Sequence, residues 1–190
     1  MSASLAPASP ARRTAPRWRG LLLSALVALG MAAGLTTAAT PASATLPPRT
    51  TLENTIAFAV KALINVERSV HGLAPVHMSS QLRLAARRHN VTMARYNEMS
   101  HQLPGEAWFG QRFHYAGYYW NYAGENIGWN SDMTQSGVLL LERLMYNEKA
   151  PNDGHRLNIL NRHYYNVGVD VYIDKTHHKV WLTTDFGHRS

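Results

Sequence analysis

Residues 124–128 read GENIG, and they place an acid inside a segment that is otherwise apolar and aromatic. Tyrosines and tryptophans between Tyr118 and Trp129 surround the stretch, and they predict a strand over about residues 118–129. A buried carboxylate is costly unless it is paired or hydrogen-bonded. We therefore expect Glu125 to meet polar groups that other segments of the chain supply.

Three other segments carry polar residues that ordinary core packing does not explain. His101 follows one predicted helix, Glu148 follows another, and His155 opens the stretch GHRLNILN at residues 154–161. Two imidazoles suit Zn²⁺ and leave open positions for water. The acids either orient the imidazoles, act as general bases on a metal-bound water, or form a hydrogen-bond network that only fixes the core.

Apolar periodicity predicts the elements around these residues. The pattern T-x-x-E at residues 50–53 is a capping box, and the helix that follows it is expected to end at Gly72. A second helix is expected to begin at Ser79 or Ser80. Further helices are predicted near 106–116 and over 134–146, and strands over 165–173 and 178–186, with a hairpin between the two strands. Helices first and antiparallel strands interleaved later indicate an α+β layered fold.

The first 44 residues have the features of a secretory signal peptide. Four arginines and no acid precede an apolar stretch over residues 20–39, and A-S-A follows at residues 42–44. We expect residues 1–44 to be removed, residues 45–50 to form a linker, and residues 51–190 to form one domain. A retained membrane anchor is the alternative, and Arg12-Arg13 leaves open whether export is Sec or twin-arginine.

The mature secreted protein is therefore expected to begin near Thr45 and to carry no stable membrane anchor. N-terminal sequencing or intact mass of protein from the culture medium checks this expectation. Recovery of the chain only from membranes, with residues 1–44 intact, would contradict it.

Charge and cysteine content exclude several function classes. The formal charge of +7 falls to +3 without residues 1–44, because 15 basic and 12 acidic residues remain. The basic residues form no run, so we expect no nucleic-acid partner. The chain has no cysteine, which removes thiolate nucleophiles and thiolate metal sites. It also contains no H-E-x-x-H and no G-x-S-x-G motif.

Four motifs in order resemble the CAP (SCP/Tpx-1/Ag5/PR-1) superfamily. Residues 93–101 (MARYNEMSH) resemble the end of the second helix of that family with its first histidine, and residues 124–127 (GENI) resemble its G-E-N-[IL] strand. Residues 154–160 (GHRLNIL) resemble the bacterial form of its G-H-[RY] motif. VGV at 167–169 with TDFG at 184–187 resembles its closing hairpin. The match spans about residues 52–187 and implies a bacterial secreted SCP-domain protein.

The resemblance implies a three-layer α-β-α sandwich with a central, mainly antiparallel sheet. It also implies a cleft with two histidines and two glutamates, which binds zinc or another divalent ion in some members. By motif match these are His101, Glu125, Glu148 and His155, with the two histidines as ligands of a weak divalent metal such as Zn. Glu125 and Glu148 are the candidate catalytic residues. Glu148 departs from the usual bacterial pattern, and Glu142 is the alternative.

Two function classes stay open, because no single reaction characterises the family. We favour a monomeric extracellular binding module for a lipid, glycan or protein ligand. The alternative is a metal-assisted hydrolase of peptide or cell-wall material. His89, on the apolar stripe of its helix, is expected in the core. The aromatic residues between Tyr115 and Trp129 are expected either to pack the sheet or to line a glycan or lipid site.

Overall fold

The computed structural model describes residues 45–189. The predicted signal peptide lies outside the described residues. Within residues 45–189, no helix has the length and apolar character needed to cross a membrane.

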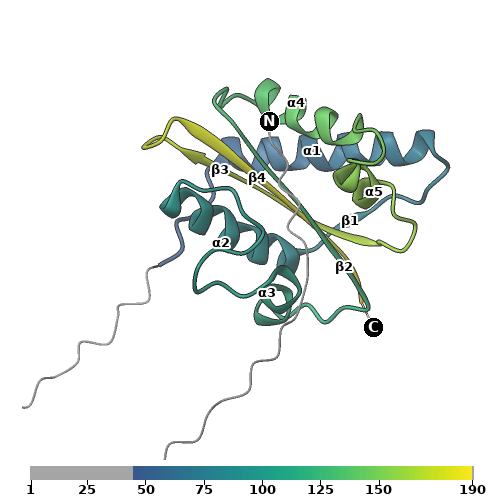
Figure 1. Ribbon diagram of the computed structural model, residues 1–190, viewed down its shortest axis with the longest axis horizontal. Helices are drawn as coiled ribbons and strands as arrows, with labels where there is room; N and C mark the ends of the chain where they lie inside the picture. The colour runs from purple at the N-terminus through teal and green to yellow at the C-terminus, as the bar shows by residue number, and fades with distance from the viewer. Residues whose placement is uncertain (1–44, 190) are drawn as a thin grey trace, which may run out of the picture. The chain divides into compact units, whose positions relative to one another are not determined.

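The centre of the domain is a four-stranded sheet in the order β1-β3-β4-β2 (Figure 1). The strands are β1 (His77–Met78), β2 (Tyr122–Asn130), β3 (Asn166–Asp174) and β4 (Lys179–His188). β1 runs parallel to β3, whereas β3 with β4 and β4 with β2 pair in the antiparallel sense. The sheet is therefore mainly antiparallel, with β2 at one edge.

Helices cover both faces of this sheet (Figure 1). α1 (Thr51–Val70), α4 (Gln135–Tyr146) and α5 (Gly154–Ile159) lie on one face, and α2 (Ser80–Tyr96) and α3 (Phe109–Tyr115) lie on the other. The predicted three-layer α-β-α sandwich is confirmed.

The first two long helices begin at the predicted caps. Thr50 and Glu53 form both hydrogen bonds of the capping box, and Ser79 accepts from the backbone N–H of Leu82. Thr134, for which no cap was predicted, caps α4. Two elements were not predicted. One is β1, which is only two residues long. The other is the short helix α5, which begins at Gly154 and has no side-chain hydrogen bond capping its start.

The two faces of the sheet differ in chemistry. Alternate residues of β3 and β4, among them Val169, Val171 and Leu182, join the largest apolar cluster with α1, α4 and α5. The intervening positions face α2 and include Asp170 and Thr183, which are fully buried and contact the Asn90 side chain of α2. Because side chains alternate along a strand, the face toward α2 is the one that carries buried charge.

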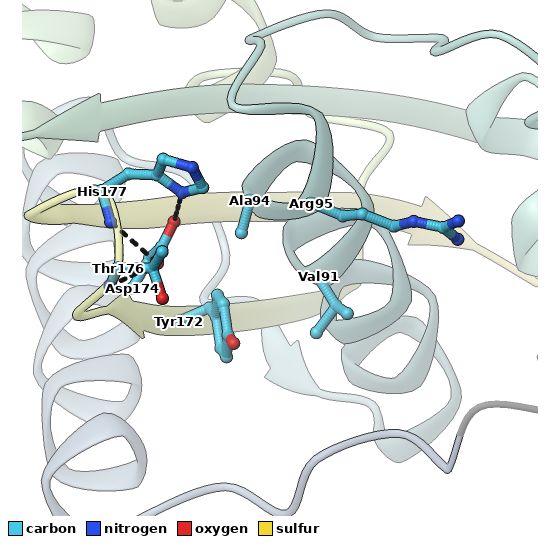
Figure 2. Close-up of a pocket in the computed structure, with 7 residues that line it drawn as sticks. All are labelled: Val91, Ala94, Arg95, Tyr172, Asp174, Thr176 and His177. Carbon is cyan, nitrogen blue, oxygen red and sulfur yellow. Dashed lines mark hydrogen bonds and ion pairs between the residues drawn. The ribbon is translucent and has the colours of Figure 1, made fainter.

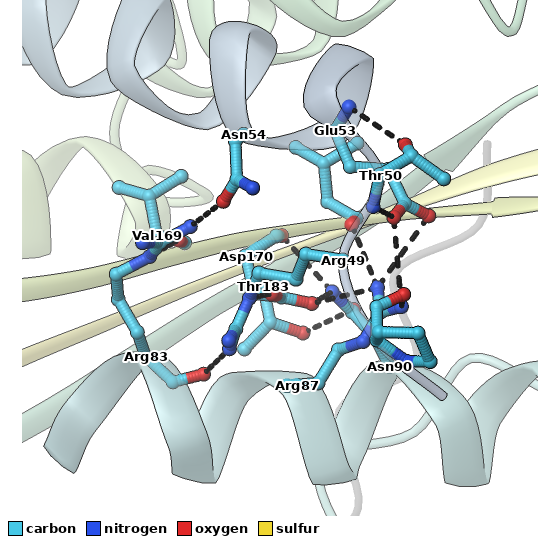
Figure 3. Close-up of polar contacts among 12 residues, drawn as sticks. Arg49, Thr50, Glu53, Asn54, Arg83, Arg87, Asn90, Val169, Asp170 and Thr183 are labelled. Carbon is cyan, nitrogen blue, oxygen red and sulfur yellow. Dashed lines mark hydrogen bonds and ion pairs between the residues drawn. The ribbon is translucent and has the colours of Figure 1, made fainter. Parts of the chain in front are cut away.

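A buried polar network fixes the start of the domain to this charged face (Figure 3). Arg49 pairs with Asp170 and donates to the backbone oxygen of Arg83 at 2.5 Å. Arg87 lies 3.5 Å from Glu53 and 3.7 Å from Asp170. Burial raises the pKa of Asp170 despite the two arginines. The segment expected to be a linker is therefore held against α2 and β3 by Arg49.

Candidate functional site

His101 and Glu125 form the first pair of site residues. His101 lies in the loop after α2, and its Nδ1 is 2.9 Å from Oε1 of Glu125 on β2. The glutamate side chain is fully buried, whereas 52% of the imidazole is exposed. Because Nδ1 faces the carboxylate, Nε2 of His101 is left free to coordinate a metal ion.

Arg112 of α3 anchors the same pair from inside the protein. Its Nη2 pairs with the second oxygen of Glu125, and its Nη1 donates to the backbone oxygens of His101 at 2.8 Å and Ala107 at 2.9 Å. One guanidinium therefore fixes both the carboxylate and the loop that carries the histidine.

The electrostatics of Glu125 keep it ionised. Burial by itself would raise its pKa, but the hydrogen bond from His101 and the charges of His89 and Arg112 outweigh that effect, so the pKa of Glu125 is lowered. A carboxylate that is already paired on both oxygens is a stable acceptor for His101.

Asp185 lies directly opposite Glu125 on β4 and is fully buried. Neither of its carboxyl oxygens has a hydrogen-bond partner among residues 45–189. Burial, followed by the charge of Glu125, raises the pKa of Asp185 well above its usual value. Of the two neighbouring acids, Glu125 therefore loses its proton before Asp185 does as the pH rises.

His89 belongs to this network as well as to the core. It is fully buried, as predicted, and its Nδ1 is 2.9 Å from Oε1 of Glu106. Its Nε2 lies 4.0 Å from Oε1 of Glu125 and has no hydrogen-bond partner within the described chain. The expectation of an ordinary core histidine is therefore incomplete, because His89 contributes to the electrostatics of Glu125.

His155 and Glu148 form the second pair. Nδ1 of His155, at the start of α5, is 2.5 Å from Oε1 of Glu148, and the backbone N–H of His155 donates to Oε2 at 3.0 Å. The side chains are 34% and 24% exposed, respectively. As in the first pair, the carboxylate occupies Nδ1 and leaves Nε2 free.

The edge strand β2 connects the two pairs. Asn126 follows Glu125 and points to the opposite face, where its amide donates to the backbone oxygen of His155 at 3.0 Å. Asn158 of α5 donates to Oδ1 of Asn126 at 2.8 Å and to the backbone oxygen of Glu125 at 3.3 Å. One pair therefore lies on each side of β2, held to consecutive residues of the same strand.

Glu142, the alternative fourth residue, lies elsewhere. It is fully buried on α4, and neither of its oxygens has a hydrogen-bond partner among residues 45–189. Burial raises the pKa of Glu142, and the charge of Glu67 on α1 raises it further. Of the two alternatives, Glu148 is the one that contacts His155.

The described residues offer few metal ligands in one place. Within residues 45–189, no group of three or more His, Asp or Glu side chains is arranged to hold a metal ion. The two pairs instead provide two imidazole Nε2 atoms, with their carboxylates already engaged on Nδ1. This set fits at most a weakly held ion completed by water.

A shallow pocket lies at the end of α2, against the β3–β4 hairpin (Figure 2). Nδ1 of His177 is 2.7 Å from Oδ2 of Asp174 there. His177 is exposed but paired with this acid, and the neighbouring His178 is exposed. None of the predicted site residues lines this pocket. Its lining is Val91, Ala94, Arg95, Tyr172, Asp174, Thr176 and His177.

The predicted aromatic cluster divides into buried and exposed members. Tyr118 is fully buried and donates to Oδ1 of Asn166 at 2.9 Å. Trp120 packs edge-on against Trp108, with 5.6 Å between ring centroids. The exposed members are Tyr115, Tyr119, Tyr122 and Trp129. Part of the aromatic cluster packs inside the domain, and the other members face solvent.

Sequence reasoning missed Arg112, Glu106 and Asn158 as site residues. Asp185 carried a usable signal, because it is a second acid in a strand-like segment. Arg112 carried none, because an arginine in a short helix is ordinary until its carboxylate partner is known.

The match to known proteins agrees with this fold. The model of the cysteine-rich secretory protein family, CAP, matches residues 61–186. The chain belongs to the CAP family. It does so without any cysteine, and a search of curated proteins finds no match.

Solved structures with the CAP fold come from several organisms. An extracellular protein with an SCP domain from Bacillus anthracis is 28% identical with a TM-score of 0.62, over 76% of this chain and 45% of that chain. A cysteine-rich secretory protein from Staphylococcus aureus is 18% identical with a TM-score of 0.54, over 74% and 40% of the two chains. The CAP structure of NaASP2 with Zn²⁺ is 12% identical with a TM-score of 0.55, over 75% and 84%. This chain therefore spans less than half of the two bacterial chains.

Proposed function

We propose that this CAP protein is an extracellular binding module that holds a divalent ion weakly at the free edge of β2, where Nε2 of His101 and Nε2 of His155 would approach the ion from the two sides of the strand. The observation that carries the proposal is the repeated arrangement of two histidines, each with Nδ1 against a glutamate. A carboxylate on Nδ1 selects the tautomer in which Nε2 can ligate, and it raises the basicity of the ring.

The residues fit a weak site and not a closed structural one. Zn²⁺ prefers four ligands, and two imidazoles supply half of them. When bound, the ion would supply a positive charge for an acidic or carbonyl group of the ligand. NaASP2, whose fold is similar, has been solved with Zn²⁺. The ligand class remains a lipid, glycan or protein, and a secreted location follows from the predicted signal peptide.

Binding is favoured over hydrolysis by the state of the two carboxylates. A general base works best when its pKa lies near the working pH. The pKa of Glu125 is instead lowered, and its oxygens are held by Arg112 and His101. Glu148 is held in the same way by the side chain and the backbone of His155. Both carboxylates are therefore already occupied by hydrogen bonds within the described chain and are poorly placed to take a proton from water.

Zinc titration of the secreted protein tests the proposal. We expect weak binding at neutral pH that falls as the pH drops through about 6, since imidazole must be neutral to ligate. His101→Ala and His155→Ala are each expected to weaken binding at least about tenfold, because each removes one of two protein ligands. Calorimetry measures all three.

The matched control is His178→Asn, which removes an exposed histidine of the β3–β4 turn. His178 has a φ of 52°, and asparagine tolerates that conformation. Equal zinc binding by wild type, His101→Ala and His155→Ala, or no binding by wild type at neutral pH, would refute the metal proposal.

A further inference from the structure

Five exposed rings form a row across one end of the sheet. The row runs from His77 on β1 through Tyr165, His188 on β4 and Tyr122 on β2 to His163. Strand pairing makes these residues neighbours: Tyr122 lies opposite His188, the backbone N–H of Tyr165 donates to Gly187, and that of His77 donates to Tyr165. We call these five residues the His–Tyr row.

The rings of the row lie against one another. Successive centroids, from His77 to His163, are 4.8, 6.3, 6.4 and 4.5 Å apart. The angles between ring planes fall from 44° at the His77 end to 7° at the Tyr122–His163 pair. Each of the three inner rings thus has a ring neighbour on either side along the row. The ring edges carry phenol O–H and imidazole N–H groups, which are hydrogen-bond donors.

None of the five side chains uses those donors inside the protein. Within residues 45–189, no hydrogen bond or ion pair involves the side chain of any member of the row. The charged residues next to the row in the chain are Arg162 and Arg189, and both are exposed. The rings next to the three histidines belong to Tyr165 and Tyr122.

The whole described surface is more basic than the composition suggests. Seven of the twelve acidic residues are buried, and Glu98 and Asp132 are the exposed acids. Seven basic residues of the described chain are exposed: Arg88, Arg95, Arg143, Lys149, Arg162, Lys175 and Arg189. An anionic partner therefore complements this surface, and little negative charge repels it.

We propose that the His–Tyr row binds a linear anionic polysaccharide. Imidazolium and the flanking arginines pair with carboxylate or sulfate groups, and the tyrosine O–H groups bond to sugar hydroxyls. Adjacent strands are about 4.8 Å apart, so the row presents donors at regular steps along a line and suits a chain better than a single small ion.

The ring geometry favours a glycan over a nucleic acid. Single-stranded nucleic acids bind through bases stacked on open aromatic faces. Each inner ring has a ring neighbour on either side within 6.4 Å, which leaves little room for a base to stack on it. The row goes beyond the metal site, because it shares none of its residues and can bind or fail to bind independently of it.

Binding of heparin and of polygalacturonate by the secreted full-length product tests the proposal. Histidines in general gain a proton as the pH falls through about 6.5. We expect Kd for both probes at low salt to be about tenfold lower at pH 5.5 than at pH 7.5, since each exposed charge pair contributes modestly. The triple variant His77→Gln/His163→Gln/His188→Gln should bind about tenfold more weakly at pH 5.5 and lose the pH dependence. Circular dichroism and melting temperature verify that the exposed substitutions leave the fold intact.

Matched controls show whether binding depends on the row itself. His178→Asn removes an exposed histidine at the opposite end of the same hairpin, and His101→Ala removes the zinc site; both should bind heparin as wild type does. Neutral dextran should not bind. The proposal is overturned if wild type binds neither anionic probe, if the triple variant binds as wild type does, or if single-stranded DNA binds more tightly than heparin.

Discussion

Arg112→Met is expected to lower the free energy of unfolding by about 3–5 kcal/mol, since it breaks a buried ion pair by removing one partner. Arg112 is the guanidinium that contacts Glu125, and its side chain is 6% exposed. Without it, Glu125 keeps a buried charge beside Asp185, and the backbone oxygens of His101 and Ala107 lose their donor. Urea denaturation measures the change.

A double variant shows whether the unpaired charge of Glu125 causes the loss of stability. Adding Glu125→Gln to Arg112→Met should recover about 1–2 kcal/mol, because the amide needs no counter-charge. Arg95→Met, at an exposed position of α2, should change stability by less than about 0.5 kcal/mol. If Arg112→Met costs no more than Arg95→Met, Arg112 does not hold the site together.

The parts of the fold that could be predicted have local causes. The capping box at Thr50, the cap at Ser79 and the alternation of β-branched residues in β3 each act within a few residues of sequence. β1 has no such signal. Its two residues are a strand because the backbone N–H of His77 finds the carbonyl of Tyr165, a partner that only tertiary folding supplies.

The candidate site likewise has some features that the sequence predicts and others that depend on tertiary contacts. Motif resemblance led to the predicted tetrad, and the structure resolves it into two His–Glu pairs on opposite sides of β2. The contribution of Asp185 depends on the β2–β4 register, which places it opposite Glu125. The charge of the protein surface could not be predicted from the sequence either, because it depends on which acids are buried. The charge of +3 that remains without residues 1–44 appears ordinary until burial removes most of the acids from the surface, including Asp170 and Asp185.

Glu142 and Glu67 form a second pair of buried acids, between α4 and α1. Burial raises the pKa of Glu67 to about 7, although Arg143 and Arg156 oppose the rise. Burial, and then the charge of Glu67, raises the pKa of Glu142 well above its usual value. The folded state therefore keeps protons that the unfolded chain releases near pH 4.3. The stability that this protonation provides is fully present below about pH 4.3 and is lost as the pH rises through about 7.

Glu142→Gln should therefore stabilise the protein in a pH-dependent way. The amide resembles the protonated acid, so the variant and wild type should be almost equally stable at pH 5. At pH 8 the variant should be more stable by about 2–3 kcal/mol, because wild type must then ionise a buried carboxyl or hold its proton at a cost. Urea denaturation at pH 5 and pH 8 measures the difference, and Glu98→Gln, at an exposed acid, should show none. Loss of stability in Glu142→Gln at pH 8 would mean that this carboxylate is ionised and paired. A fall in its zinc affinity would place Glu142 in the metal site in place of Glu148.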